Sequence, residues 1–215
     1  MGAVLVDITM SLDGFIAGPD PGPDQPLGRG GERLHDWAYG LATFNERHGR
    51  SGGTKNADDE VLADALGKAG AVVMGRGMFG GGDGPWGDDP WEGWWGDDPP
   101  FRVPVFVLTH HAREALAKDG GTTFTFVTDG VEAAVGQARA AAGGQDVSVA
   151  GGADVIQQCL RAGLIDQMQI HLAPIVLGGG IRLFDRLDEA GIELEKTGVI
   201  DSPAVTHLSF RMARR

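Results

Sequence analysis

The chain has 215 residues, of which 42% are hydrophobic and 22% are charged, enough for one folded core or at most two small ones. Its 18 Lys and Arg against 30 Asp and Glu give a net charge of −12, which would repel nucleic-acid phosphates and anionic lipid. The single cysteine, Cys159, excludes an internal disulfide and a cysteine-based zinc site.

No apolar stretch approaches the roughly 20 residues that a membrane-spanning helix needs. The first residues, MGAVLVDITM, lack a basic segment and indicate a core strand rather than a signal peptide. We therefore expect a cytoplasmic protein that binds neither membranes nor nucleic acid.

The hydrophobic pattern predicts strands that are separated by helices. Strands are expected at 3–10, 71–74, 103–109, 123–127, 146–150 and 166–173, and helices at 57–69, 131–142 and 153–162. Two late strands, at about 192–200 and 204–213, are joined by a turn at Asp201-Ser202-Pro203. This order predicts a single α/β domain over 1–215, with a mixed, mostly parallel sheet flanked by helices and an antiparallel C-terminal hairpin.

A loop insertion rich in Gly, Trp and Asp is expected at about 78–102. It holds four of the five tryptophans, Trp86, Trp91, Trp94 and Trp95. A low-complexity linker is one interpretation, but disordered segments are poor in aromatic residues, so this loop is expected to pack over a cofactor cleft or a neighbouring subunit. Its aspartates lack an accompanying histidine, and we predict no metal site.

Three predicted strands end in loops suited to phosphate. The loops are Gly75-Arg76-Gly77, Thr109-His110-His111 and Gly151-Gly152-Ala153, the last of which opens a helix. Ligands of open α/β sheets bind beyond the carboxyl ends of parallel strands, and a helix N-terminus offers unpaired N–H groups to an anion. A glycine after a strand is usually only a turn, but three such loops together predict a phosphate-bearing ligand.

Several motifs resemble the dihydrofolate reductase-like superfamily, especially the reductase domain of bacterial riboflavin biosynthesis and its stand-alone relatives. SLDGFIAG is similar to that family's first loop, VVMGRGMF to its Gly-Arg phosphate loop and VFVLTHH to its adenosine-side strand end. VAGGADVIQQCLRAGLIDQMQIHLAPIVLGGGIRLF is similar to its glycine-pair helix, the next strand and its Gly-rich loop. The resemblance spans most of residues 3–185, whereas the usual G-x-G-x-x-G signature is absent.

The resemblance implies a dihydrofolate reductase-like three-layer fold, NADPH as cofactor and a homodimer. Three groups of residues would hold the cofactor: Thr9, Ile16 and Ala17 at the nicotinamide; Gly75, Arg76, Thr109, His110 and His111 at the adenosine 2′-phosphate; Ala150, Gly151, Gly152, Ala153 and Asp154 at the pyrophosphate. The carboxylate of Asp154 would repel a pyrophosphate, so we expect this residue to start the helix with its side chain turned outward.

Hydride transfer needs a positioned acceptor, a proton source and exclusion of water. The loop 11–18 is expected to act as a lid, in which Asp13 is either a turn cap or a carboxylate near the nicotinamide or the substrate. Asp36 is the nearest match to the carboxylate that holds the pterin in folate-reducing relatives, and Trp37 would stack on a flat ring. The alternative is an amphipathic helix with an exposed Asp36 and a buried Trp37.

The Gly-rich loop near Gly179 and Arg182 lies close to the substrate in relatives, and Arg182 would hold a substrate phosphate or cap a carboxylate. His171 and His207 are interpreted as structural or interfacial. Together these features predict an NADPH-dependent oxidoreductase that reduces a small heterocyclic, pterin- or pyrimidine-like, or carbonyl compound. The alternatives are a non-catalytic NADP(H)-binding or regulatory protein of the same fold, and an unrelated nucleotide-phosphate binder.

Overall fold

The computed structural model describes residues 2–22, 24–187 and 190–213, which form two compact units. The first unit comprises the described residues up to Val6 together with Ala69–Ile165. The second comprises Asp7–Lys68 and the described residues from Asp166 onward. The single domain over 1–215, with its insertion at about 78–102, stays a prediction.

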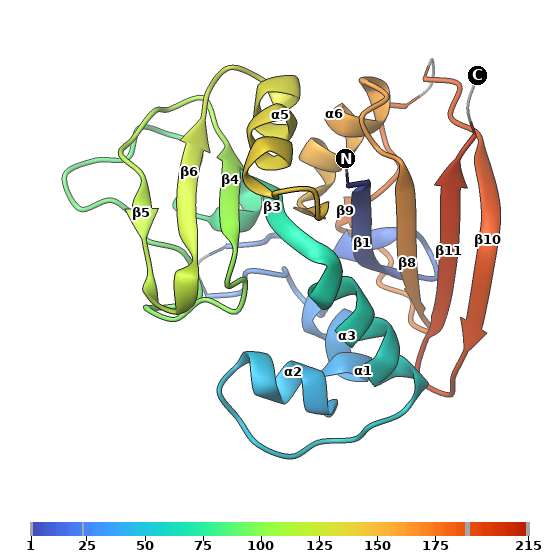
Figure 1. The fold of residues 1–215 in the computed structure, drawn as a ribbon. Coiled ribbons are helices and arrows are strands. Elements are labelled where there is room, and N and C mark those ends of the chain that lie inside the picture. The colour runs from blue at the N-terminus through green and yellow to red at the C-terminus, as the bar shows by residue number, and fades with distance from the viewer. Residues whose placement is uncertain (1, 23, 188–189, 214–215) are drawn as a thin grey trace. The chain divides into compact units, whose positions relative to one another are not determined.

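The first unit is built on a parallel sheet (Figure 1). The start of β1 (Val4–Ser11) pairs with β7 (Asp146–Gly151), which pairs with β3 (Ala69–Gly75). The sheet continues through β4 (Pro104–Leu108) and β6 (Thr123–Val127), all parallel, to an antiparallel edge strand, β5 (Leu116–Ala117). Parallel neighbours need crossover connections, and helices supply several of them here.

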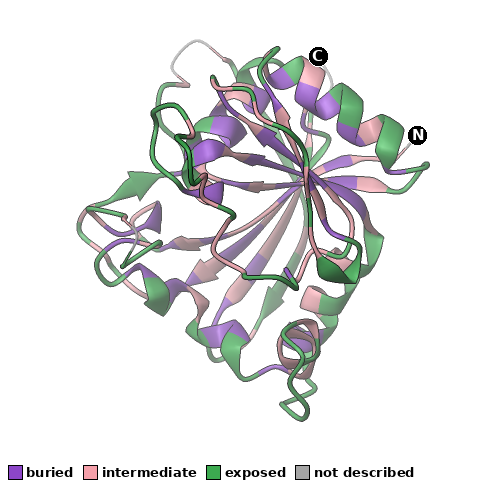
Figure 2. Cartoon of the chain, turned by 90° about the vertical axis from the view of Figure 1, so that its left-hand side faces the viewer, coloured by how far each residue is buried: buried purple, intermediate pink, exposed green. Residues whose placement is uncertain are grey.

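Helices complete the first unit. α5 (Val131–Ala141) buries Val131, Ala134, Val135 and Ala138 against β3 and β4, which is the face that its sequence spacing predicts. α6 (Ala153–Arg161) follows β7, the short α4 (Arg76–Phe79) follows β3, and η2 spans Asp119–Gly121. Buried residues line the strands in Figure 2, and α5 and α6 each combine buried residues with exposed ones.

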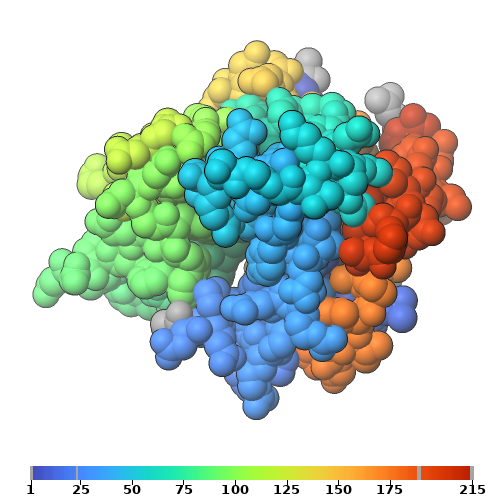
Figure 3. All heavy atoms as spheres, turned by 90° about the horizontal axis from the view of Figure 1, so that it is seen from below, coloured from blue at the N-terminus to red at the C-terminus, as the bar shows by residue number. Residues whose placement is uncertain are grey.

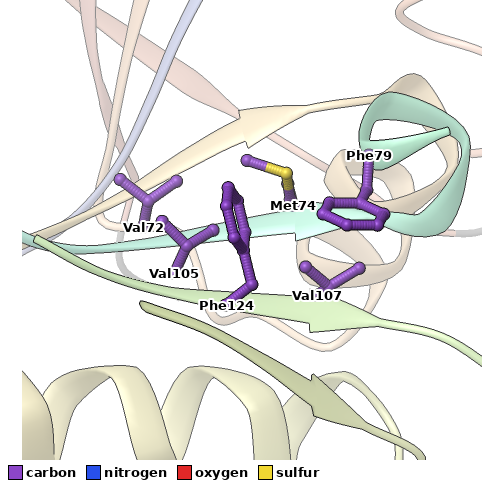
Figure 4. Close-up of a cluster of buried hydrophobic side chains, with 6 residues drawn as sticks. All are labelled: Val72, Met74, Phe79, Val105, Val107 and Phe124. Carbon is purple, nitrogen blue, oxygen red and sulfur yellow. The ribbon is translucent and has the colours of Figure 1, made fainter. Parts of the chain in front are cut away.

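A cluster of apolar side chains fills one face of this sheet (Figure 4). Its buried members are Val72, Met74, Phe79, Val105, Val107 and Phe124. The tryptophan-rich loop packs on the same cluster through Trp86, Trp91 and Trp95. The indole nitrogens of Trp91 and Trp94 donate hydrogen bonds to the carbonyls of Phe79 and Met78, at 2.8 and 2.9 Å. The aromatic residues of this loop therefore cover the core of their own unit.

The second unit contains the predicted C-terminal hairpin. β11 (Thr206–Met212) lies between β10 (Leu194–Asp201) and β8 (Gln167–Ala173), and both pairings are antiparallel. A small separate sheet joins β2 (Phe15–Ala17) to β9 (Ile181–Arg182). The helices of this unit are η1 (Gly31–His35), α1 (Asp36–Tyr39), α2 (Ala42–Arg47) and α3 (Ala57–Lys68).

The expected fold class is confirmed: the sheet is mixed and mostly parallel, with flanking helices and an antiparallel hairpin. Each expected strand and helix is present, with ends that move by at most two residues. The short strands β2, β5 and β9 and the short helices α2, α4 and η2 have no counterpart in the predictions, whereas α1 holds the Asp36 and Trp37 of the helix considered there. Within the described ranges, no helix is long and apolar enough to span a membrane.

Candidate functional site

Three loops leave the same edge of the parallel sheet in the first unit. Gly75 at the end of β3 lies opposite Leu108 of β4, and Met74 lies opposite Gly151 of β7. A Cβ placed on Gly75 would lie 3.7 Å from the backbone nitrogen of Gly152. Because the strands are parallel neighbours, the loops that follow them converge where α/β sheets hold ligands.

The loop after β7 leads directly into α6. Gly152 is the N-cap residue, and no side chain caps this helix end. A Cβ on Gly152 would meet no atom within 4 Å, so the space beside this turn is open. The peptide bond between Gly151 and Gly152 is cis. Open space beside the first N–H groups of a helix is suited to a phosphate group.

The flanking residues of this turn differ in exposure. Ala153 is buried, whereas Ala150 is partly buried and packs on the apolar cluster. The carboxylate of Asp154 accepts a hydrogen bond of 2.6 Å from Nε2 of Gln158, one turn further along α6. The Asp154 side chain is therefore bonded along an exposed helix surface, as expected for a residue that starts the helix.

Arg76 is a buried side chain held by the tryptophan-rich loop. Its Nε and Nη2 donate hydrogen bonds of 3.0 Å to the carbonyls of Gly80 and Gly81. Its guanidinium carbon lies 3.1 Å from the ring centroid of Trp86. Nη1 is buried and has no hydrogen-bond partner among the described residues. Burial, and then the charge of Arg113, lower the pKa of Arg76, but a guanidinium remains charged at neutral pH.

A cavity of about 580 Å³ adjoins the loop after β4. Trp86, His110, His111 and Arg113 are among its lining residues. Trp86 donates a hydrogen bond of 2.8 Å from its indole nitrogen to the carbonyl of His111, and Arg113 lies over the same indole at 4.6 Å. Thr109 accepts a hydrogen bond from the backbone nitrogen of His111 at 3.2 Å. An aromatic face beside basic side chains suits a ligand that joins a flat ring to an anion.

In the second unit, Asp13 ties the loop 11–18 to the Gly-rich loop. Its carboxylate accepts hydrogen bonds from the Ser11 hydroxyl at 2.7 Å and from the backbone nitrogens of Leu177 and Gly178 at 3.1 and 2.7 Å. The Ser11 hydrogen bond has the largest effect on the pKa of Asp13; burial opposes it, and the backbone hydrogen bonds from Gly178 and Leu177 add to it, so that the pKa falls to about 2. These contacts are those of a turn cap, and a catalytic role of Asp13 stays a prediction.

The other predicted residues of the two loops also meet within this unit. Ile16 and Ala17 are buried in β2, where Ala17 lies opposite Ile181. A Cβ on Gly180 would lie 2.1 Å from the carbonyl oxygen of Ala17, so the two strands approach closely only because Gly180 has no side chain. Gly179 next to it has open space at its Cβ position.

Arg182 is bound to the first loop. It donates a hydrogen bond of 3.2 Å to the carbonyl of Asp13 and lies over the ring of Phe15 at 4.6 Å. These contacts leave its predicted role at the substrate a proposal.

Asp36 and Trp37 differ sharply in exposure. Asp36, the first residue of α1, is exposed, whereas Trp37 is buried. The indole nitrogen of Trp37 donates a hydrogen bond of 3.2 Å to the hydroxyl of Thr9, which is also buried. The structure thus shows the exposed aspartate and buried tryptophan of the amphipathic alternative.

Beside Trp37, four side chains form a hydrogen-bonded chain. Nε2 of His171 lies 3.0 Å from Oδ1 of Asp7, the Nδ1 atoms of His171 and His207 lie 2.6 Å apart, and Nε2 of His207 lies 3.0 Å from Oδ1 of Asp58. The Trp37 ring packs on both imidazoles, with centroid distances of 4.7 and 5.2 Å. Within the described part of the chain, no group of three or more His, Cys, Asp or Glu is arranged to hold a metal ion.

The sequence model of the RibD C-terminal domain family matches residues 3–207. This chain belongs to the RibD C-terminal domain family. No curated protein matches the chain.

Solved structures show the same fold as this RibD C-terminal domain chain. A protein from Shewanella sp. PV-4, named for riboflavin biosynthesis, is 24% identical with a TM-score of 0.67 and 99% coverage of both chains. A diaminohydroxyphosphoribosylaminopyrimidine deaminase/5-amino-6-(5-phosphoribosylamino)uracil reductase from Thermotoga maritima is 14% identical, with a TM-score of 0.56 and coverage of 99% of this chain and 57% of its own. Dihydrofolate reductase from Enterococcus faecalis, complexed with NADP(H) and RAB-propyl, is 12% identical, with a TM-score of 0.51 and coverage of 99% and 98%. The predicted resemblance is confirmed, and the neighbours share the fold of this chain.

Sequence reasoning interpreted the two strand histidines as structural or interfacial and missed the hydrogen bond between them. Alternation along 166–173 placed His171 on a polar face with Gln167 and Gln169, but the structure buries His171. His171 and His207 are directly opposite each other in the β8–β11 pairing. A histidine in each of two predicted antiparallel strands was the only sequence signal of this pair. No sequence signal identified Asp7 and Asp58 as their carboxylate partners.

Proposed function

We propose that this protein is an NADPH-dependent reductase that transfers a hydride to a small heterocyclic, pterin- or pyrimidine-like, or carbonyl compound. Its family and the reductases among its structural neighbours support the reductase class. The proposal includes a homodimer in the cytoplasm.

The observation that carries the proposal is the convergence of three loops at one edge of the parallel sheet. Two features there fit a phosphate-bearing cofactor: the open space beside Gly152 at the start of α6, and the buried Nη1 of Arg76, which has no hydrogen-bond partner in the described ranges of the chain. The turn Ala150-Gly151-Gly152-Ala153-Asp154 would bind the pyrophosphate through backbone N–H groups. Gly75, Arg76 and the loop from Thr109 to His111 would hold the adenosine 2′-phosphate.

We propose that Thr9, Ile16 and Ala17 flank the nicotinamide and that Trp37, Gly179 and Arg182 contribute to substrate binding. NADPH, when bound, supplies the hydride. The protein's part is to orient the acceptor, keep water out and supply a proton. Of the two carboxylates considered from the sequence for the reacting end, Asp36 is exposed and Asp13 has both oxygens in hydrogen bonds.

Calorimetric titration with NADPH, NADH and FMN tests the cofactor. We expect NADPH to bind most tightly, because the Arg76 guanidinium offers positive charge to a 2′-phosphate and the two histidines lie in the neighbouring loop. Tighter binding of FMN would contradict the proposal and favour an unrelated nucleotide-phosphate site.

Turnover is tested by the loss of NADPH absorbance with 5-amino-6-(5-phosphoribosylamino)uracil and with dihydrofolate, the compounds that the neighbouring enzymes are named for. Steady oxidation with either compound, or with simple aldehydes, supports a reductase. NADPH binding without turnover would favour a non-catalytic NADP(H)-binding or regulatory protein.

A further inference from the structure

The chain Asp7–His171–His207–Asp58 connects four separate elements of the second unit, β1, β8, β11 and α3. Three of its side chains are almost fully buried, with exposed fractions of 3% for His171, 0% for His207 and 5% for Asp58. Asp7 is 21% exposed. Any proton that enters or leaves the chain therefore passes most readily through Asp7.

The three hydrogen bonds of this chain fix the number of protons that its ring nitrogens and carboxylates hold. Each of its three hydrogen bonds needs one proton between its two heavy atoms. Two neutral imidazoles bring only two protons, and ionised carboxylates bring none. The three bonds therefore require one surplus proton, held away from bulk water.

The hydrogen-bond pattern makes His171 the ring that carries two protons when His207 is neutral. Burial is the largest effect on His207 and lowers its pKa, so His207 is the neutral partner, which donates from Nε2 to Asp58 and accepts at Nδ1. His171 then donates from both ring nitrogens, to Asp7 and to His207. His35, on η1, also faces the chain, and burial, followed by repulsion from His171, lowers its pKa to about 4, while Asp36 opposes this shift. His35 therefore stays neutral and does not compete for the proton.

The chain adjoins the residue proposed to flank the nicotinamide. Asp7 and Thr9 are two residues apart on β1, so their side chains lie on the same face of that strand. Trp37 connects Thr9 to the two histidines of the chain, because its indole nitrogen donates a hydrogen bond to the Thr9 hydroxyl and its ring packs on both imidazoles. Oδ2 of Asp7 is buried and has no hydrogen-bond partner among the described residues.

We propose that this chain is a proton store that supplies the proton of the reduction through the carboxyl group of Asp7. The inference rests on the proposed reductase function. Asp7 is the catalytic group, and His171, His207 and Asp58 are positioning residues that hold the proton behind it.

NADPH, when bound, would supply the hydride to the carbon of a C=N or C=O bond of the substrate, and the Asp7 carboxyl group would give a proton to the heteroatom. The Nε2–H bond of His171 breaks as the carboxyl O–H bond forms, and this bond breaks in turn as the substrate N–H or O–H bond forms. His171 is left neutral, and a solvent proton that enters through Asp7 restores the imidazolium.

Nitrogen-15 NMR of the wild-type protein without ligands tests the proton count. We expect three protonated ring nitrogens in the His171–His207 pair at neutral pH, with Nδ1 of His207 bare. The His171→Asn and His207→Asn variants assign the signals. Two bare ring nitrogens in the pair would overturn the surplus proton, whether or not the protein reduces any compound.

Steady-state kinetics with NADPH and 5-amino-6-(5-phosphoribosylamino)uracil tests the delivery step. For Asp7→Asn we expect kcat to fall by roughly 100-fold or more, the range for a lost general acid, while the KM for NADPH stays within about two-fold. Asp58→Asn should shift the pH profile of kcat, because it disturbs the proton on the chain rather than the cofactor. Asp64→Asn, an exposed aspartate of the same helix, is the matched control and should change neither quantity.

The outcomes separate the two proposals. If the wild-type protein turns over the substrate and Asp7→Asn keeps its kcat, the proton-delivery role is overturned and the reductase stands. If the wild-type protein neither binds NADPH nor oxidises it, the reductase fails and delivery fails with it, while the NMR count still decides whether the chain stores a proton.

Discussion

The guanidinium carbon of Arg76 lies 3.1 Å from the ring centroid of Trp86, and Arg113 lies over the same indole at 4.6 Å. The indole thus sits near two like charges, which it stabilises through its electron-rich face. Because Arg76 also bonds the carbonyls of Gly80 and Gly81, the tryptophan-rich loop fixes the residue proposed to recognise the 2′-phosphate.

Arg76→Ala should weaken NADPH binding and leave NADH binding almost unchanged. The loss of a charge-assisted contact to the 2′-phosphate should weaken the binding free energy of NADPH by about 1–3 kcal/mol, measured by calorimetric titration. Arg102→Ala, an exposed arginine of the same unit, is the control. Equal losses for the two nucleotides would reject a role in reading the phosphate and point to a loosened loop instead.

Phe124→Ala should destabilise the first unit. Phe124 is fully buried at the centre of the cluster in Figure 4, where Phe79 packs edge-on at a centroid distance of 5.1 Å. Truncation leaves a cavity, and we expect the free energy of unfolding, measured with denaturant, to fall by about 3–5 kcal/mol. Phe184→Ala, at a position that is 43% exposed, should cost far less. Similar costs for both variants would contradict the assigned core.

Asp13 should make the second unit sensitive to acid. Its pKa is about 2 in the folded chain and 3.8 in the unfolded chain, so its stabilising effect is present above pH 3.8 and is lost as the pH falls towards 2. The difference in melting temperature between the wild type and Asp13→Asn should therefore shrink across this window. A difference that stays constant with pH would show that the ionised carboxylate does not tie the two loops together.

Cys159 should be unreactive in the folded protein. Burial is the main cause that raises the pKa of its thiol from 9.0 to about 12, with a smaller effect of Glu132. A thiol reagent should therefore label the native protein only when α6 opens, and label the denatured protein rapidly. The folded state prefers the protonated thiol, so stability should also fall as the pH rises above 9. Rapid labelling under native conditions would contradict this burial.

Val199→Lys should weaken the proposed homodimer. β10 is an edge strand, and its Val199 and Ile200 are 50% and 42% exposed. The atoms of β10 and β11, in red, lie at the surface in Figure 3. A charge on an edge strand opposes pairing with a second copy, and sedimentation should show a shift towards monomer. Val176→Lys, at an exposed loop position outside β10, is the control. A wild-type protein that is monomeric would refute the dimer itself.

The fold could be predicted because its long elements follow simple hydrophobic patterns. β3 is buried along most of its length, and α5 repeats its buried residues at helical spacing, so both were recognised. β2 and β9 escaped prediction because three and two residues are too few to show a period. Their pairing depends on the close approach of Gly180 to Ala17, which only the folded backbone displays.

The candidate site was predictable where it consists of loops that directly follow strands. The turn after β7 shows its two glycines and its helix in consecutive residues. The hydrogen-bonded chain from Asp7 to Asp58 was not predictable from the sequence, because its members are far apart in it. His171 lies 36 residues from His207 and 164 from Asp7, and His207 lies 149 from Asp58. Each residue alone has an ordinary structural interpretation, and only the β8–β11 pairing and α3 bring them together.

The opposed imidazoles also bear on how the C-terminal hairpin finds its alignment. Shifting β11 by one position along β8 would turn every side chain of the strand to the other face, separating the two rings and leaving both buried nitrogens without a partner. A misaligned hairpin therefore loses polar contacts as well as apolar packing, so this pair of rings selects one alignment among those that hydrophobicity alone would tolerate.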